Sequence, residues 1–335
     1  MHMISCIQFF NKETIKGLIS LREGEEKLGE TLHISQDGQI SEFPGQFVIL
    51  GISEDIGIRA NHGLAGAASA YRSFVKSFVN VHNTSKFNGD QFLLLGQIPT
   101  DDLMKQSQGA DIQKLRQLTA RLDDLVYPVI EKIVSANKIP IIIGGGHNNV
   151  FPILKGCSMA CNEPLNTINL DAHADFRHTE GRHSGNGFRY AYDAGFLKKY
   201  ALLGLHEAYN NEDIVNELIE NADFLPIFFE DVFLRKKESW KEAQRRAVIF
   251  VKDQRFGVEL DVDSLENLLS SAWSSVGVSS SESLHYLYTC GKQKQVCYLH
   301  ITEAVYKRSD GEENVLIGKL INYMVQAFCK GVQEQ

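Results

Sequence analysis

The sequence predicts a three-layer α/β/α fold around a sheet of about eight mostly parallel strands. Short runs rich in β-branched and aromatic residues alternate with longer segments of helical periodicity, which is the order of successive βα units. Most of these runs are apolar throughout, as expected for parallel strands that helices cover on both faces. The composition, 43% hydrophobic and 23% charged, provides enough apolar residues for a large core.

The predicted strands and helices alternate along the chain. We expect strands at residues 47–51, 92–96, 140–143, 167–170, 201–205, 226–229, 256–260 and 296–301. We expect helices at residues 67–79, 111–137, 212–219, 239–251 and 314–330. In the second of these helices Leu115, Leu118 and Leu122 recur at three- and four-residue steps, and Pro128 is expected to kink it.

The chain shows no boundary between two large domains. No linker rich in Pro, Gly or Ser and no abrupt change of composition interrupts residues 46–335, so we expect them to form a single domain. Residues 1–45 are expected to form an N-terminal extension of exposed helix and loop. Six scattered cysteines contain no Cys-x-x-Cys pair, which argues against a zinc knuckle or a disulfide framework and favours reduced thiols.

The charge and hydropathy patterns exclude several classes of partner. A formal net charge of -8 without a basic stripe argues against nucleic-acid binding, although local arginines could still bind a small anionic substrate. No apolar run approaches the roughly 18 residues that a membrane span requires. The N-terminus lacks the pattern of a signal peptide, so we expect a cytoplasmic protein that binds no membrane.

Three groups of polar residues follow predicted strands, where ligands bind in open parallel sheets. In the first group His147 follows three glycines, Gly144 to Gly146, which allow the backbone to approach another group closely. A dinucleotide-binding fingerprint would require glycine at position 149, where this chain has Asn149. The first group therefore predicts a histidine at the end of a strand and no dinucleotide site.

The second and third groups place acidic residues on one face of an extended chain. Asp171, His173 and Asp175 follow one predicted strand, and residues two apart share a face. Asp261 and Asp263 follow another strand with the same spacing. Carboxylates and an imidazole this close repel and desolvate one another unless a cation neutralises them.

Each group also has a structural explanation when it is taken by itself. A single histidine at a strand end is most often a hydrogen-bonded structural residue, and an Asp-x-Asp after a strand is often a helix cap or a turn. Three such groups at strand ends of one parallel sheet are better explained by a metal centre. Four carboxylates and two imidazoles without a thiolate suit hard or borderline divalent ions, manganese better than a structural zinc. Six ligands exceed the need of one ion, so we expect two ions about 3.5–4 Å apart.

The three groups, in this order, resemble the signature of the ureohydrolase family, which contains arginases, agmatinases and formimidoylglutamases. The family pattern is Gly-Gly-x-His, then Asp-Ala-His-x-Asp, then Ser-x-Asp-x-Asp-x-x-Asp-Pro. The corresponding segments here run from Gly144 to His147, from Asp171 to Asp175 and from Glu259 to Asn267. Glu259, Glu266 and Asn267 stand where the family has Ser, Asp and Pro. The resemblance extends from Phe47 to Ala304 and implies an arginase-like fold.

The resemblance implies a role for each of the clustered residues. It assigns one ion to His147, Asp171, Asp175 and Asp261, and a second ion to Asp171, His173, Asp261 and Asp263. It also implies that Asp175 orients the attacking water, and that Glu303 receives the amidine or guanidine group of the substrate.

The loop after the second group carries the remaining expected site residues. Arginases and agmatinases have a proton-shuttling histidine there, whereas this chain has Ser184 at that position, as formimidoylglutamases do. His183, one residue earlier, is the candidate for the missing acid. Ser184 and Asn186 are expected to contact the substrate.

Arginines near this loop favour a substrate with an acidic tail. Asp175-Phe176-Arg177 resembles the Asp-x-Arg of formimidoylglutamases, and Arg177, with Arg182 and Arg189 as alternatives, is expected to bind a carboxylate. The resemblance therefore implies hydrolysis of N-formimidoyl-L-glutamate to L-glutamate and formamide, a step of histidine degradation. The first alternative is a guanidino-compound hydrolase that releases urea, and the second is a catalytically silent relative kept for binding or regulation. Family members are commonly trimers or hexamers, so a homo-oligomer is expected.

Overall fold

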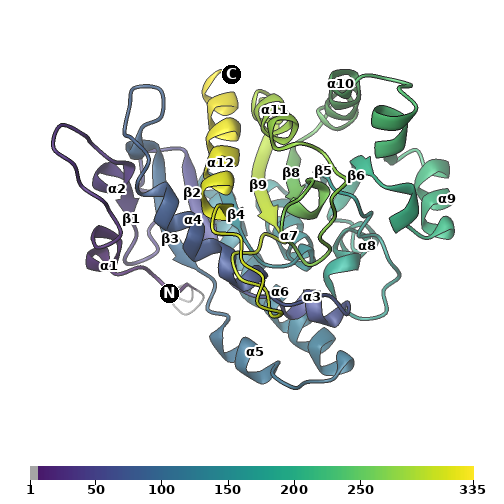
Figure 1. Ribbon diagram of the computed structural model, residues 1–335, viewed down its shortest axis with the longest axis horizontal. Helices are drawn as coiled ribbons and strands as arrows, with labels where there is room; N and C mark the ends of the chain where they lie inside the picture. Colours follow the sequence, from purple (N-terminus) through teal and green to yellow (C-terminus); the bar gives the residue numbers. More distant parts are fainter. Residues whose placement is uncertain (1–6) are drawn as a thin grey trace.

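A single parallel sheet forms the frame of the structure. The computed structural model describes residues 7–335, in which nine strands form one sheet with every neighbouring pair parallel (Figure 1). The strand order is β1-β3-β2-β4-β9-β8-β5-β6-β7. The strands are β1 (His33–Ile34), β2 (Phe47–Gly51), β3 (Phe92–Gln97), β4 (Ile139–Ile143), β5 (Leu165–Leu170), β6 (Leu197–Leu205), β7 (Phe224–Phe228), β8 (Phe256–Asp261) and β9 (Val296–Thr302).

Helices cover both faces of this sheet, which gives the predicted three layers (Figure 1). One face packs against α4, α10, α11 and α12, and the other packs against α3, α6, α7, α8 and α9. The helices are α1 (Lys12–Lys16), α2 (Leu28–Thr31), α3 (Ile56–Ala60), α4 (Ala70–Phe78), α5 (Asp101–Gln106), α6 (Ile112–Ser135), α7 (Val150–Cys161), α8 (Gly187–Asp193), α9 (Glu212–Glu220), α10 (Trp240–Val251), α11 (Ser280–Gly291) and α12 (Ile317–Gln333).

The continuously apolar strands follow from burial on both faces. In β4, Ile141 and Ile143 belong to the hydrophobic cluster on one side of the sheet, and Ile142 belongs to the cluster on the other side. Successive side chains of a strand point to opposite faces, so a strand covered on both sides needs apolar residues at every position. This arrangement confirms the predicted fold class.

All eight predicted strands are present, and the structure adds a ninth. The additional strand β1 pairs with Leu93 and Leu94 of β3 at one edge of the sheet. A strand of two residues is too short to show a period in the sequence, which is why it was not predicted. The sheet is also parallel throughout, where the sequence predicted mostly parallel pairing.

The N-terminal segment is packed more tightly than an exposed helix and loop. Ile15 and Leu28 have no exposed surface and join the same hydrophobic cluster as Phe74 of α4. Helices α1 and α2 lie beside β1 and β3 in Figure 1. Residues 1–6, which include Cys6, lie outside the described part of the chain.

The five predicted helices are all present, with ends shifted by a few residues, and α6 continues through Pro128. Two long helices were missed. Helix α7 is apolar around most of its circumference and shows no amphipathic stripe. Helix α11 begins after Ser279, which forms a capping box with Glu282, a signal that could have revealed it. No helix within residues 7–335 is long and apolar enough to cross a membrane.

The strand order explains where a site can form. Strands β4, β9, β8 and β5 are consecutive neighbours at the centre of the sheet, and all run in the same direction. Their carboxyl ends therefore lie side by side at one edge, although they are far apart in the sequence. The residues that end or follow these strands include His147, Glu303, Asp261 and Asp171.

Candidate metal centre

The turn after β4 carries His147 to the carboxyl edge of the sheet. Gly144 and Gly145 have φ of 93° and 79°, a region that residues with a side chain rarely adopt. The carboxylate of Glu54 holds the turn by accepting a hydrogen bond from the Gly146 N–H at 2.9 Å. The His147 side chain that follows is fully buried.

The segment after β5 turns within five residues and is held by Asn210. The Nδ2 of Asn210 donates to the Ala172 carbonyl at 3.1 Å, and its Oδ1 accepts from the Ala174 N–H at 2.8 Å. Asp175 then adopts φ of 46°, an uncommon left-handed conformation. Sequence reasoning missed Asn210 because nothing in the local pattern distinguishes it from any other loop asparagine.

The first candidate cluster converges on the Nδ1 atom of His147. This atom lies 2.8 Å from an oxygen of Asp175, 3.1 Å from one of Asp171 and 3.2 Å from one of Asp261. It makes no hydrogen bond of ordinary geometry to any of them. The four ligand atoms all lie within 4.8 Å of one another. Convergence on a common point, without pairing, is the arrangement that a bound cation requires.

The second candidate cluster contains Asp171, His173 and Asp263, whose ligand atoms also lie within 4.8 Å of one another. The Nδ1 of His173 is 3.0 Å from an oxygen of Asp263 and 3.7 Å from one of Asp171. The other oxygen of Asp263 is buried without a hydrogen-bond partner among the described residues. Both clusters contain Asp171. Asp261 was expected in both clusters, but its ligand atom meets the 4.8 Å limit only in the first.

The burial of so many carboxylates disturbs their protonation. Burial raises the pKa of Asp175 to about 6, and the charge of Asp171 adds to the effect. Burial and the charge of Asp263 raise the pKa of Asp261 well above its ordinary value. Burial alone would lower the pKa of His147, but the surrounding carboxylates raise it well above the usual value. Protons thus compensate charge that divalent cations could neutralise.

Glu303 faces this centre from the end of β9. Its Oε1 accepts a hydrogen bond from the His147 N–H at 3.1 Å, and its Oε2 accepts one from the Ser271 hydroxyl at 2.7 Å. Burial raises the pKa of Glu303 to about 8. Its backbone has φ of 60°, so both Asp175 and Glu303 are held in strained conformations at the site.

Glu259 of β8 lies on the opposite side of the His147 ring. One of its oxygens is 3.4 Å from the Nε2 of His147 and 2.7 Å from the Nδ1 of His300. Its other oxygen accepts a hydrogen bond from the Tyr298 hydroxyl at 2.7 Å. Burial would raise the pKa of Glu259, but the two histidines lower it below its ordinary value. The sequence contained one sign that this position is unusual, because Glu259 stands where the ureohydrolase pattern has a serine.

A cavity of about 240 Å³ opens onto the two clusters. Its lining includes the predicted residues His173, Asp175, Arg177, Ser184, Asp261, Asp263 and Glu303. Asn61 and Ser271 also line it and were not predicted. Asn61 donates to the Ser184 hydroxyl at 3.4 Å and accepts from Arg177 at 3.5 Å, so it links two predicted residues at the mouth.

Two residues predicted for catalysis or substrate binding, His183 and Asn186, do not line this cavity. The His183 side chain is fully buried, and its Nδ1 accepts a hydrogen bond from the Gly185 N–H at 3.2 Å. Burial lowers the pKa of His183 to about 4. Asn186 donates to the Gly181 carbonyl at 2.8 Å. Both side chains make hydrogen bonds within the loop, and their expected roles in catalysis and substrate binding stay predictions.

Arg177 is the one arginine of the three candidates that reaches the cavity. Arg182 is buried and pairs with Asp123 at 2.8 Å, which ties the loop to α6. Arg189 pairs with Glu217 of α9. Neither Arg182 nor Arg189 lines the cavity, so among the three arginines the cavity favours Arg177.

Family comparison classifies this fold and site. The model of the Arginase family matches residues 45–323, from just before β2 into α12. The chain belongs to the Arginase family. The match includes all the residues of both candidate clusters.

Several named relatives and solved structures are similar to this Arginase-family chain. The formimidoylglutamase of Salmonella arizonae is 27% identical over 233 residues, which cover 68% of this chain and 61% of the relative. The chain thus spans less than two thirds of the length of that relative. A formimidoylglutamase structure from Bacillus subtilis has a TM-score of 0.77 at 16% identity, covering 94% of each chain. A Trypanosoma cruzi formiminoglutamase structure with Mn2+2 has a TM-score of 0.71 at 20% identity, covering 92% of this chain and 98% of that one.

The hydrogen bonds of Asn210 generate a stability prediction. Asn210→Ala removes the side chain that pairs with the backbone of Ala172 and Ala174, so we expect the free energy of unfolding to fall by about 2 kcal/mol. Urea unfolding of metal-free protein measures the change. The control is Asn211→Ala at the exposed neighbour, which makes no capping hydrogen bond and should change stability by less than about 0.5 kcal/mol. Equal effects of the two substitutions would contradict the assignment.

Proposed function

We propose that this chain is a metal-dependent hydrolase that converts N-formimidoyl-L-glutamate and water to L-glutamate and formamide, a reaction of histidine degradation. The observation that carries the proposal is the overlap of two ligand clusters at Asp171, beside a cavity that also presents Glu303 and Arg177. The formimidoylglutamases among the relatives support the choice of substrate.

We further propose that the clusters hold two manganese ions. The donors are carboxylate oxygens and imidazole nitrogens with no thiolate, which suits this metal, and the unpaired Nδ1 of His147 and Oδ1 of Asp263 are free to bind. The Trypanosoma cruzi relative with Mn2+2 supports this choice. When bound, two such ions supply an acidified water and positive charge close to the scissile bond.

Glu303 positions the reacting group of the substrate. Its carboxylate is placed to accept hydrogen bonds from the amidinium nitrogens, and the charge of the amidinium favours the ionised form of a carboxyl whose pKa burial raises to about 8. Ser271 and the backbone of His147 fix the orientation of this carboxylate. The amidine carbon is then held at the edge of the two clusters.

Asp175 carries the proton of the reaction. Its side chain belongs to the first cluster and also lines the cavity. It accepts a proton from the attacking water and returns it to the departing glutamate nitrogen as the C–N bond breaks. This route needs no histidine shuttle, in agreement with Ser184 at the shuttle position and with His183 buried away from the cavity.

Arg177 provides the selectivity for an acidic tail. Its side chain is half exposed at the mouth of the cavity and is near Asn61 and Glu180, so a substrate carboxylate can reach it. A guanidinium binds a carboxylate through two parallel hydrogen bonds. Ser184 lies close enough to Asn61 to add a third polar contact.

The alternatives differ in substrate or in chemistry. A guanidino-compound hydrolase would use the same centre and release urea, and a silent relative would keep the fold without turnover. The departures at Glu266 and Asn267 and the absence of a shuttle histidine at Ser184 are the observations that favour the silent relative, and Glu266 is exposed. The N-terminal extension at residues 1–45, the single domain at 46–335, the cytoplasmic location and assembly into trimers or hexamers stay predictions.

A product assay tests the proposed reaction. Manganese-loaded protein is offered formimidoylglutamate, arginine, agmatine and guanidinobutyrate, and we expect glutamate and formamide from the first compound alone. Asp171→Asn is the inactive control, and we expect its activity to fall by more than about 100-fold because both clusters share that residue. Urea from any guanidino compound would place the protein with the first alternative. If protein with two bound ions turned over none of the four compounds, both the proposed reaction and the first alternative would be contradicted for these substrates.

The role of Arg177 has its own prediction. Arg177→Ala removes the contact to a substrate carboxylate, so we expect KM for formimidoylglutamate to rise about 10-fold with little change in kcat. Steady-state kinetics measure both constants. Arg121→Ala on the exposed side of α6 is the matched control and should leave both unchanged. A fall in kcat at unchanged KM would show that Arg177 acts on the chemistry and does not bind the tail.

Glu259 is predicted to support the metal through His147. Glu259→Gln removes the charge that orients the imidazole, so we expect the affinity for Mn²⁺ to fall by about 10- to 100-fold. Isothermal titration calorimetry measures the affinity, and circular dichroism verifies the fold. Glu266→Gln, the exposed departure from the family pattern, is the control and should bind Mn²⁺ like the unaltered protein. Unchanged affinity in Glu259→Gln would overturn this role.

A further inference from the structure

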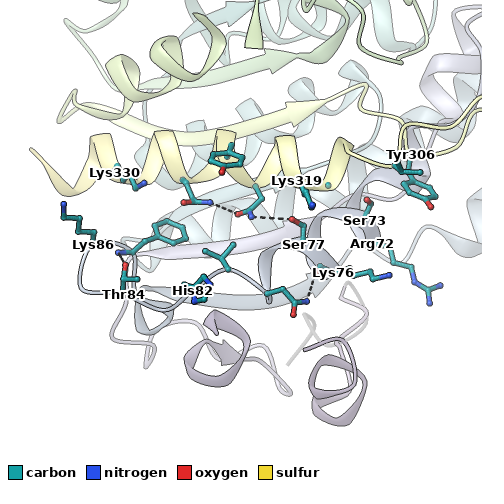
Figure 2. A pocket seen from close by; sticks show the side chains of 18 of the residues that line it. Arg72, Ser73, Lys76, Ser77, His82, Thr84, Lys86, Tyr306, Lys319 and Lys330 are labelled. Atoms are coloured by element: carbon teal, nitrogen blue, oxygen red, sulfur yellow. Dashed lines mark hydrogen bonds between the residues drawn. The ribbon is translucent and has the colours of Figure 1, made fainter. Parts of the chain in front are cut away.

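A second and larger cavity lies on the face of the sheet that α4 and α12 cover. Its volume is about 1190 Å³, against about 240 Å³ for the cavity at the metal centre. The two cavities have no lining residue in common. Figure 2 shows it as an elongated groove along α12, bounded by α4 and by the segment 81–87. The proposed reaction makes no use of this groove.

The charge of the groove is opposite to that of the chain. The chain has a formal net charge of -8, yet no Asp or Glu lines the groove. The lining contains five Lys or Arg residues, which are Arg72, Lys76, Lys86, Lys319 and Lys330. None of the five forms an ion pair with a carboxylate within residues 7–335, although many other cations of the chain do. This unneutralised positive charge favours an anionic occupant.

The cations form two groups at opposite ends of the groove. In Figure 2, Lys86 and Lys330 lie at one end, and Arg72, Lys76 and Lys319 lie toward the other. The part of α12 that lines the groove runs from Gly318 to Lys330, which corresponds to a length of roughly 18 Å at the helical rise per residue. A single small anion could contact only one of the two groups, whereas an extended chain could contact both.

The floor of the groove offers hydrogen bonds between the two charged ends. Helix α12 approaches α4 closely at Gly318, where a side chain would meet the Ser73 carbonyl at 2.3 Å. Beyond this contact, Asn322 donates to the Ser77 hydroxyl at 3.5 Å, and Gln326 donates to Asn322 at 3.3 Å. The side-chain carbonyl oxygen of Gln326 makes no hydrogen bond within residues 7–335, so it can accept one from the backbone N–H of a peptide.

An exposed aromatic residue completes the groove. Tyr323 is 61% exposed at its rim, and Val315 is 66% exposed at one end. Exposed apolar side chains beside unpaired cations are typical of surfaces that bind another protein segment. These two side chains can pack against an apolar residue of a bound segment that has acidic residues on either side of it.

We propose that this groove binds an acidic peptide segment of another protein. A segment of about five or six extended residues spans the distance between the two cationic groups. Its carboxylates pair with the cations at both ends, its backbone meets the amides of the floor, and an apolar residue packs on Tyr323. The proposal is independent of the reaction at the metal centre, because the two cavities are separate.

A binding experiment on the intact chain tests this proposal. The probe is a fluorescein-labelled peptide of sequence Glu-Asp-Glu-Leu-Glu-Asp-Glu, and fluorescence anisotropy measures its Kd. We expect saturable binding that Lys76→Glu with Lys319→Glu weakens at least 10-fold, and that added salt also weakens. The control is Lys105→Glu with Lys241→Glu, two exposed cations outside the groove, which gives the same change of net charge. The control should alter the Kd less than 2-fold.

Several outcomes would overturn the proposal. They are no saturable binding of the peptide, equal weakening by both double variants, or equally tight binding of inorganic phosphate or a short single-stranded oligonucleotide. A second copy of this chain is the other occupant to be tested, and sedimentation velocity measures whether the chain self-associates through the groove. If the groove variants shift the oligomeric state and the peptide does not compete with assembly, the groove is an interface between copies. Formimidoylglutamate turnover by the groove variants should stay within 2-fold of the unaltered protein, which separates this test from that of the proposed function.

Discussion

The constraint on which the structure depends is the mutual repulsion of carboxylates buried at the carboxyl ends of β5 and β8. Asp171, Asp175, Asp261 and Asp263 lie close together with little access to water, where an uncompensated negative charge costs several kcal/mol. Protonation and the imidazole of His147 relieve this repulsion in the metal-free chain. Divalent ions held by the same residues would neutralise this charge, so the repulsion within the clusters and their proposed affinity for metal have one cause.

The surrounding elements hold this unfavourable arrangement in place. Asp175 and Glu303 both adopt left-handed backbone conformations, which cost free energy and persist only where neighbouring contacts enforce them. The Glu303 N–H donates to the Gly145 carbonyl at 3.0 Å, and Asn210 holds the segment that precedes Asp175. Two of the seven non-glycine residues with positive φ within residues 7–335 therefore lie at this site, and the parallel sheet around them supplies the rigidity.

The sequence predicts the strands and the clustered residues because both depend on local patterns. Continuous apolar runs identify eight strands, and polar residues immediately after them fall at one edge of the sheet. Period-two spacing does not place all three residues in one cluster. Asp171 and Asp175 join the first cluster, while His173 joins the second with Asp171 and Asp263. The orientations of His183 and Asn186, and the contributions of Glu54 and Asn210, depend on how loops distant in sequence meet. No local period encodes those contacts.

In the proposed reaction, charge balance would connect the metal centre to the choice of substrate. Four clustered carboxylates, with Glu259 behind His147 and Glu303 at the edge, carry more negative charge than two divalent ions neutralise. The excess favours a cationic group such as an amidinium next to Glu303 and disfavours a substrate carboxylate there. A substrate that carries both charges must therefore enter with its cationic end inward and its carboxylates toward the mouth. Arg177 is the exposed cation that lines the cavity at this point, so the polarity of the site would orient the proposed substrate before any specific contact forms.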